Sequence, residues 1–231
     1  MVKKVKIRNI EIYAFSDRQV LLNFIEEQKK ILIAVNAEKV MIDEPRLSRI
    51  INKNIGYPDG IGVIKALKQK GLNANKIPGV ELWLDIINAF YKEKSFYLLG
   101  SSRDVIVKTT IKLKEQYPGI KILGYRNGYM DKAAIEEVKK IIIEKKPDIV
   151  FVGQGSPKQE YLMDDFIKIH PALYMGLGGS FDVFSGLKKR APALFIKHNL
   201  EWLYRLLMEP TRFKRQLVLA KFLMLLKIEK L

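Results

Sequence analysis

Residues 148–179 read DIVFVGQGSPKQEYLMDDFIKIHPALYMGLGG, and this stretch decides the fold class. An apolar run at 148–153 ends in glycine, a segment with helical spacing of apolar residues spans 156–169, and a second apolar run occupies 172–179. Short apolar runs separated by a helix are typical of parallel strands joined by a crossover helix. The stretch therefore predicts a strand–helix–strand unit of an α/β protein.

The same alternation extends toward the N-terminus. Apolar runs at 95–100 and 120–125 predict two strands, each followed by a helix, the first ending at Tyr117 and the second spanning about 131–145. Farther upstream, DRQVLLNFIEEQ predicts an amphipathic helix, KILIAVNAEKVM a strand leading into a helix, and DGIGVIKALKQKG a turn leading into another helix. We therefore expect a Rossmann-like parallel sheet with helices on both faces, which binds ligands at the carboxyl ends of its strands.

Composition limits the possible chemistry. The 231 residues suffice for one domain, or one domain with an appendage. The absence of cysteine excludes disulfides and thiolate chemistry, and the two histidines, His170 and His198, are too few and too far apart for a zinc cluster. Residues 1–15 alternate charged and apolar side chains, which predicts a strand rather than a secretory leader. We expect a cytoplasmic protein.

Positive charge is concentrated near the C-terminus. The net charge is +16, and the segment from Lys188 to Leu231 contains eleven Lys and Arg against three Glu, a net charge of +8. Its last part, LVLAKFLMLLKIEKL, is apolar but shorter than the roughly 20 residues that cross a bilayer. This pattern favours a helix lying on an anionic membrane or packed on its own domain or a second subunit. We expect a core at 1–190 and a basic amphipathic appendage at 191–231, interrupted at Pro210.

Two glycine turns follow neighbouring apolar runs. In GQGSPKQE, Gly153 and Gly155 allow close backbone approach, and the helix start that follows can hold a phosphate. The sequence GLGGSFD repeats this arrangement, with Asp182 near the strand end. Neither turn has the dinucleotide-binding spacing or a phosphate-binding lysine of the Walker type. The turns indicate a nucleotide site, or else only tight connections between strands and helices.

The segment YPDGIGV (57–63) holds a carboxylate in an apolar context. Asp59 follows a proline and precedes a glycine, which is typical of a turn residue or helix N-cap. A carboxylate on a loop over a parallel sheet could equally act as a general base.

Seven motifs occur in the order and spacing of a known family: AVNAEKVM, YPDGIGVI, GYRNGYM, VGQGSPKQE, GLGGSFDVFSG, RAP and EWLYRLLMEPTRFKR. From about Ile10 to Arg215 the sequence resembles the WecG/TagA/CpsF family of glycosyltransferases (glycosyltransferase family 26). The resemblance implies transfer of N-acetylmannosamine from UDP-ManNAc to GlcNAc on a polyprenyl diphosphate, in teichoic acid or surface polysaccharide synthesis. It also implies a Rossmann-like core with a C-terminal appendage, and no metal or other cofactor is expected.

The resemblance assigns roles to residues of this chain. It implies that Asp59 is the catalytic base, that Gln159 hydrogen-bonds the donor or leaving group, and that Asn36 lines the same pocket. Arg205, Arg212 and Arg215 would neutralise the departing UDP or bind the diphosphate of the acceptor. The other residues expected to bind substrate are Lys76, Gly100, Tyr125, Gly153, Gln154, Pro157, Glu160, Gly178 and Asp182.

Two positions depart from the family pattern. Lys76 stands where many relatives carry arginine, and Val35 stands where threonine is frequent. Lysine keeps the charge but loses the bidentate geometry of arginine. These differences leave open another UDP-sugar donor, such as ManNAc uronate, glucuronate or a hexose.

Other classes of function remain open. A basic membrane- or nucleic-acid-binding protein would explain the charge, although the appendage lacks a known nucleic-acid recognition motif. A nicotinamide oxidoreductase would use a similar sheet but carries a glycine fingerprint that this sequence lacks. We expect a peripheral enzyme of the inner membrane face that binds a UDP-sugar, a polyprenyl-diphosphate acceptor and anionic lipid, but no nucleic acid. Apolar residues on the appendage make a homo-oligomer plausible.

Overall fold

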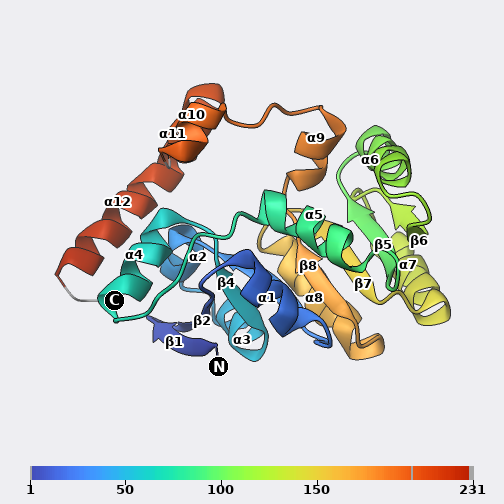
Figure 1. Ribbon diagram of the computed structural model, residues 1–231, viewed down its shortest axis with the longest axis horizontal. Coiled ribbons are helices and arrows are strands. Elements are labelled where there is room, and N and C mark those ends of the chain that lie inside the picture. Colours follow the sequence, from blue (N-terminus) through green and yellow to red (C-terminus); the bar gives the residue numbers. More distant parts are fainter. Residues whose placement is uncertain (1, 199, 229–231) are drawn as a thin grey trace.

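A six-stranded parallel sheet forms the centre of the protein in the computed structural model, which describes residues 2–198 and 200–228 (Figure 1). The strand order is β4-β3-β8-β7-β5-β6. The strands are β3 (Ile31–Val35), β4 (Ile55–Pro58), β5 (Ser95–Gly100), β6 (Lys121–Arg126), β7 (Ile149–Gly153) and β8 (Leu173–Gly176). The expected Rossmann-like parallel sheet is confirmed.

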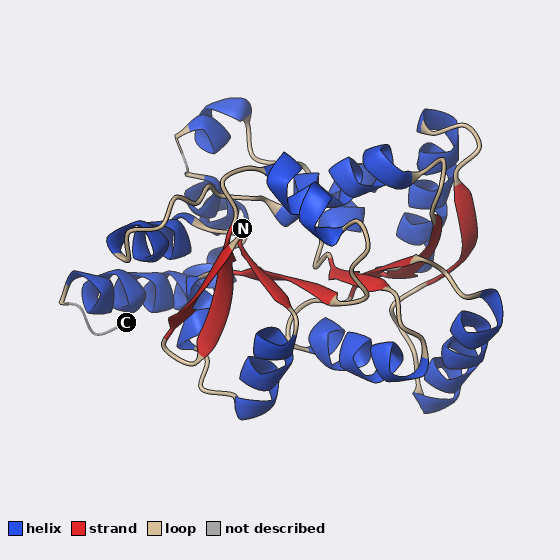
Figure 2. Cartoon of the chain, turned by 60° about the horizontal axis from the view of Figure 1, so that its bottom comes forward, coloured by secondary structure: helices blue, strands red, loops and turns tan. Residues whose placement is uncertain are grey.

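Helices cover both faces of this sheet (Figure 2). Along β3, Ile31, Ile33 and Val35 pack into one apolar cluster and Leu32 packs into the other, because successive strand residues point to opposite faces. Helices of the first cluster are α2 (Ala37–Met41), α3 (Pro45–Lys53), α4 (Ile61–Gln69), α7 (Lys132–Lys145) and α8 (Lys158–Ile169). Those of the second are α1 (Arg18–Ile25), α5 (Gly79–Phe90), α6 (Arg103–Gln116) and α9 (Ser180–Ser185).

The N-terminal segment differs from its expected single strand. It forms an antiparallel hairpin of β1 (Lys3–Ile7) and β2 (Ile10–Ala14), which pair only with each other. Charged and apolar residues alternate both before and after the turn. This pattern therefore did not reveal that the segment divides into two strands. Arg8 enters the turn with a φ of 52°, a conformation that its side chain does not predict.

Local sequence explains where several helices begin. Asp17, Asn36 and Asp131 accept backbone N–H bonds at the starts of α1, α2 and α7. Helix α6 ends before Tyr117, as expected. The sequence-based interpretation omitted β4, α3 and α5. Strand β4 has only four residues, whereas α5 carries polar residues at helical spacing, namely Glu81, Asp85 and Asn88.

The C-terminal segment forms a chain of helices after α9. It contains α10 (Ala193–Lys197), α11 (Glu201–Met208), the 3₁₀ turn η1 (Pro210–Arg212) and α12 (Phe213–Lys227). The expected interruption at Pro210 is confirmed, because α11 ends at Met208 and the turn begins at the proline. Helix α12 contacts α2 and α4, and Phe222 is fully buried among core residues (Figure 1).

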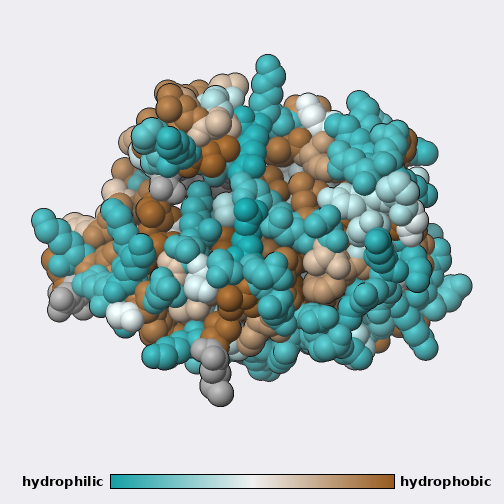
Figure 3. Space-filling model, viewed as in Figure 1, coloured by the Kyte–Doolittle hydropathy of each residue, from teal (hydrophilic) through white to brown (hydrophobic). Residues whose placement is uncertain are grey.

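Apolar side chains gather on the surface over α10 and α11 (Figure 3). The exposed members are Leu194, Leu200, Trp202, Leu207 and Met208, and α12 adds Phe213, Leu217 and Met224. Among the residues described, no helix is both long enough and apolar enough to cross a bilayer.

Candidate active site

The carboxyl ends of the parallel strands bring most of the predicted site residues to one edge of the sheet. Asn36 follows β3 and Asp59 follows the neighbouring β4, while Gly100, Gly153 and Gly176 end β5, β7 and β8. From β3 the chain adds β4 at one side of the sheet, and from β5 it adds β6 at the other side. Open α/β sheets bind ligands in the crevice at the carboxyl edge where the direction of strand addition reverses.

Asp59 and Asn36 lie side by side. The backbone N–H of Asp59 donates to the carbonyl of Val35 at 2.9 Å, so the loop after β4 is tied to the end of β3. Asn36 Oδ1 accepts from Lys39 N at 3.0 Å as the N-cap of α2, which leaves its Nδ2 as the group that a ligand could meet. Asp59 Oδ2 accepts from Gly79 N at 3.5 Å, a long contact that a substrate hydroxyl could replace.

Tyr57 lies beneath this pair on β4. Its side chain is fully buried, and its hydroxyl has no hydrogen-bond partner among the described residues. The hydroxyl oxygen is 2.9 Å, and Asp59 Oδ2 is 3.7 Å, from the position that a Cβ on Gly79 would occupy. Burial raises the pKa of Tyr57 well above its ordinary value, and the charges of Asp59 and Glu160 raise it further. Tyr57 is therefore a neutral phenol next to the candidate base.

Gln159 and Glu160 begin α8 and point into the protein. Glu160 is fully buried and pairs with the nearly buried Lys39 of α2, with Oε1 and Nζ 2.7 Å apart. Lys39 Nζ also donates to the carbonyl of Ala34 in β3 at 2.9 Å. Gln159 donates from Nε2 to Glu160 Oε1 at 3.2 Å and accepts the N–H of Gly178 at 2.9 Å. Both ends of the Gln159 amide are thus used inside the protein.

A second group of predicted residues meets at the ends of β5 and β7. The hydroxyl of Ser101 donates to Asp182, which lies in the first turn of α9 rather than directly at a strand end. Ser101 N donates to the carbonyl of Gly153 at 2.9 Å, and Gln154 Nε2 donates to that of Gly128 at 2.7 Å. These contacts join the loops that follow β5, β6 and β7 to the start of α9, so their polar groups lie together at the carboxyl edge of the sheet.

Glycine is required at the end of β5. Gly100 has a φ of 137°, and a Cβ there would lie 2.3 Å from the carbonyl oxygen of Gly153. At Gly153 a Cβ would lie 2.8 Å from the ring of Phe181, so packing also requires this glycine. Pro157 is the N-cap residue of α8 and follows a cis peptide bond.

Of the remaining predicted binding residues, Tyr125 lies away from the Asp59–Asn36 pair, whereas Lys76 precedes Ile77, whose N–H donates to the carbonyl of Pro58 at 2.9 Å. Tyr125 belongs to the outermost strand, β6, and is half exposed. Lys76 forms an ion pair with Glu201 at the start of α11, at 3.5 Å, and therefore joins the core to the C-terminal helices. The backbone of Arg205, Arg212 and Arg215 belongs to α11, η1 and α12, but the side chains of these arginines lie outside the described part of the protein.

The linker to the C-terminal helices is also tied to the core. Arg190, just before α10, pairs with Glu81 of α5, and Arg18 Nη1 contacts Glu81 Oε2 and Asp85 Oδ2, each at 2.9 Å. Lys188 pairs with Glu209 at 3.2 Å. The linker is therefore bound to α5 and to the segment after α11, while the Lys76–Glu201 pair and Phe222 join the C-terminal helices directly to the core.

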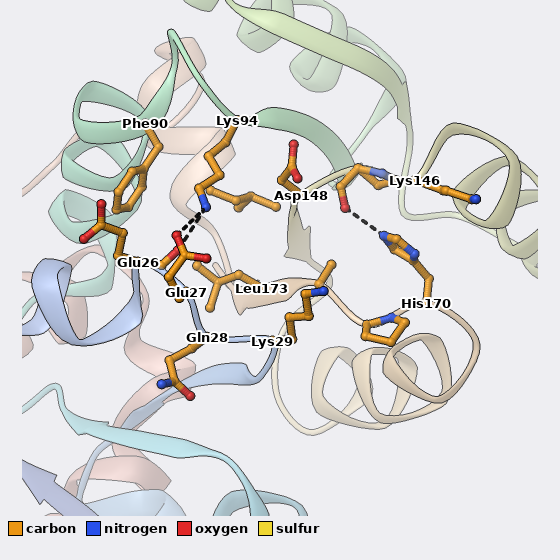
Figure 4. A pocket seen from close by; sticks show the side chains of 14 residues that line it. Glu26, Glu27, Gln28, Lys29, Phe90, Lys94, Lys146, Asp148, His170 and Leu173 are labelled. Atoms are coloured by element: carbon orange, nitrogen blue, oxygen red, sulfur yellow. Dashed lines mark hydrogen bonds and ion pairs between the residues drawn. The ribbon is translucent and has the colours of Figure 1, made fainter.

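A cavity of about 250 Å³ lies at the opposite edge of the sheet, near the amino ends of β7 and β8 (Figure 4). Lys94 Nζ pairs there with Glu27 Oε1 at 3.3 Å, and His170 Nε2 lies 2.9 Å from the carbonyl oxygen of Pro147. Asp148 in this cavity accepts from Ser95, and parallel sheets bind ligands at the other edge. We therefore place the candidate site at the carboxyl edge.

The structure adds three residues that the sequence did not reveal. Tyr57, Lys39 and Ser101 contribute polar groups beneath or beside the predicted site. Ser101 directly follows a predicted strand, and that position could have indicated it. Lys39 and Tyr57 gave no such signal, because their surroundings come from distant parts of the chain. Over residues 2–198 and 200–228, no group of three or more His, Cys, Asp or Glu side chains could hold a metal ion.

Comparison with known protein families identifies the family of this chain. The chain matches the family described as "Glycosyl transferase WecG/TagA/CpsF family" over residues 3–231, which is nearly its whole length. The protein therefore belongs to this glycosyltransferase family, and the resemblance stated from its motifs is confirmed.

Proposed function

We propose that the protein is an inverting glycosyltransferase that moves N-acetylmannosamine from UDP-ManNAc to GlcNAc on a polyprenyl diphosphate, forming a β-1,4 linkage. Family membership establishes a transferase that uses a sugar donor and an acceptor. The observation that carries the finer proposal is the placement of Asp59 beside Asn36 at the ends of two neighbouring strands. A carboxylate at this edge is positioned to meet both a nucleotide-bound sugar and an incoming hydroxyl.

In the proposed reaction Asp59 accepts the proton of the acceptor's hydroxyl group. The hydroxyl oxygen then forms a bond to the anomeric carbon from the face opposite the nucleotide, the bond from that carbon to the β-phosphate oxygen breaks, and UDP leaves with the bonding electrons. An α-linked donor thereby gives a β-linked product. The negative charge that develops on UDP needs hydrogen-bond donors or cations.

The donor would lie along the edge formed by β5, β7 and β8. Gly100 and Gly153 end two strands of this edge, Gly155 has open space beside it, and α8 begins beyond Gly155, where a helix N-terminus favours an anion. Gln154, Pro157, Gly178 and Asp182 border the same region. Tyr125 on β6 marks its outer end and offers an exposed ring for the nucleoside.

The C-terminal helices supply the surface for the lipid-linked acceptor. Exposed apolar side chains over α10, α11 and α12 occur together with the exposed lysines Lys197, Lys221 and Lys227, a composition suited to the interface of an anionic bilayer. We assign Arg205, Arg212 and Arg215 to the diphosphate of the acceptor or the departing UDP, because guanidinium groups bind phosphate in a bidentate manner. In this proposal the enzyme works at the inner face of the membrane, and the same apolar surface pairs two copies when lipid is absent.

The proposal is tested by UDP release from UDP-ManNAc with a short-tailed GlcNAc-diphosphate-lipid acceptor. Wild type should release UDP only with acceptor, Asp59→Asn should lose about 1,000-fold in rate, and Arg212→Ala should lose about 10- to 100-fold. Asp43→Asn is the matched control, since Asp43 is an exposed loop carboxylate that belongs to none of the predicted site residues. Full activity of Asp59→Asn would exclude this residue as the base.

Further arms of the same assay test the partners. Activity with another UDP-sugar alone would change the donor and keep the mechanism, whereas silence with every UDP-sugar would contradict the proposed reaction. Undiminished activity in EDTA supports metal-independent transfer. Sedimentation with anionic vesicles, compared with retention on DNA, separates the membrane partner from a nucleic-acid partner.

A further inference from the structure

A buried ion pair lies directly behind the candidate site. Lys39 and Glu160 are 6% and 0% exposed, and they join α2 to α8 across 121 positions of sequence. A buried ion pair is expensive, because both charges lose their hydration. Replacement by apolar side chains would often be neutral or stabilising, so stability alone does not explain a pair at this place.

The pair determines which way the amide of Gln159 points. An ionised carboxylate only accepts hydrogen bonds, so Glu160 Oε1 must face the NH₂ group of Gln159. The carbonyl oxygen of Gln159 is then turned toward the N–H of Gly178, from which it accepts at 2.9 Å. With the amide reversed, its NH₂ group would meet the Gly178 N–H, donor against donor. The ammonium group of Lys39 lies 2.7 Å from the same oxygen of Glu160.

We propose that Lys39 and Glu160 are positioning residues that hold the Gly178 turn in its binding conformation through Gln159. Gly178 has a φ of 55° and connects β8 to α9. Gln159 links the pair to this turn, since its NH₂ group donates to Glu160 and its carbonyl oxygen accepts from Gly178.

The effect of the pair reaches the second half of the site. The Gly178 turn leads into α9, whose Asp182 accepts the hydroxyl of Ser101 at the end of β5. Ser101 in turn accepts the N–H of Gly128 at 2.8 Å on its carbonyl. A polar path therefore runs along the carboxyl edge of the sheet from α2 to the loop after β6. This path begins at the buried Lys39–Glu160 pair. The direction of the hydrogen bonds along the path therefore depends on the carboxylate of Glu160.

Amide hydrogen exchange of the full-length protein tests this proposal without any ligand. In Glu160→Gln and Lys39→Met the Gly178 amide should exchange about tenfold faster or more relative to core strand amides, as loss of one supported hydrogen bond predicts. Gln159→Met should give the same increase while keeping the ion pair, and it remains informative if the charge variants fail to fold. Lys39→Arg should restore slow exchange.

The matched control is Asn54→Ala. Asn54 is a buried amide that accepts the N–H of Ile31 at 3.0 Å, the same kind of contact at the opposite edge of the sheet. It should lower stability and leave Gly178 exchange unchanged relative to the core. Unchanged relative exchange of Gly178 in Glu160→Gln or Gln159→Met would overturn the proposal and leave the pair a purely structural contact.

Calorimetry with UDP supplies the functional readout and rests on the proposed function. Glu160→Gln and Gln159→Met should weaken UDP binding by about tenfold, and Asn54→Ala should not. Altered Gly178 exchange with unaltered UDP affinity would overturn the binding role of the turn. Wild type that binds no UDP would instead contradict the proposed donor, while the exchange result would still decide whether Lys39 and Glu160 hold the turn.

Discussion

Phe222 is the side chain by which α12 is held on the core, and its removal gives the sharpest test of the fold. The side chain is fully buried, and two of its ring carbons lie 3.2 and 3.3 Å from the position of a Cβ on Gly62. The Cβ of Ala37 is 3.4 Å from the same point. Gly62 is in the first turn of α4, after Asp59, and Ala37 begins α2, after Asn36. Phe222 therefore packs against the helix starts that carry the candidate base and its neighbour.

The expected effect of Phe222→Ala follows from this burial. Truncation of a buried phenylalanine costs about 3–5 kcal/mol. Helix α12 lies at the surface near the end of the chain and can separate from α2 and α4, so the loss should weaken its docking more than it weakens the sheet. A loss of about 3 kcal/mol corresponds to a shift of roughly 100-fold in the docking equilibrium.

Hydrogen exchange of α12, together with limited trypsin cleavage at Lys221 and Lys227, measures this shift. In Phe222→Ala the amides of α12 should exchange roughly 100-fold faster, while those of β5 and β7 stay protected. Met224→Ala on the same helix is the control, because Met224 is 57% exposed. Unchanged exchange of α12 in Phe222→Ala would refute the reasoning, and so would an equal effect of Met224→Ala, since burial would then not explain the loss.

Three further changes have defined outcomes in denaturant unfolding or exchange. Gly100→Ala should lose at least about 3 kcal/mol in unfolding free energy, because its Cβ would meet backbone at 2.3 Å, whereas Gly119→Ala, with nothing within 4 Å, should lose about 1 kcal/mol from its positive φ alone. A hydrogen bond from the Tyr161 hydroxyl lowers the pKa of Glu44, so this bond stabilises the protein above the ordinary carboxyl pKa and is lost as pH falls through the lowered value. Tyr161→Phe should therefore be less stable than wild type at pH 7, and the difference should shrink as pH falls through the lowered pKa of Glu44; a difference that stays unchanged in acid would contradict this assignment. Lys76→Met should speed exchange in α11 without affecting α8, because it removes a partly buried partner of Glu201.

Local signals predicted much of the fold. The apolar runs that became β5 and β7 needed no information beyond their composition, since strands buried on both faces contain few polar residues. Asp131 capped α7 and Pro210 separated α11 from α12 because capping and proline geometry act within one helical turn.

Elements that depend on contacts between distant parts of the chain could not be predicted in this way. Strand β4 contains Gly56, where a Cβ would lie 2.9 Å from the carbonyl oxygen of Glu11 in the hairpin. Nothing in IGYP indicates this close approach, because the hairpin comes from a separate part of the chain. The apolar segment of α12 allowed a membrane-facing helix or a packed one, and the burial of Phe222 shows that one face packs on the core.

By itself the sequence determined the fold class, the family and the position of Asn36 after a strand, and it placed Asp59 on a loop over the sheet. These follow from periodicity and from motifs contained in short segments. Only the tertiary structure decided that β3 and β4 are neighbours, that Lys39 neutralises Glu160, and that Gln159 is bonded to the Gly178 turn. The physical reason is that a buried charged group needs an oppositely charged side chain nearby. Which residue lies nearby is determined by the order of the strands in the sheet and not by distance along the sequence.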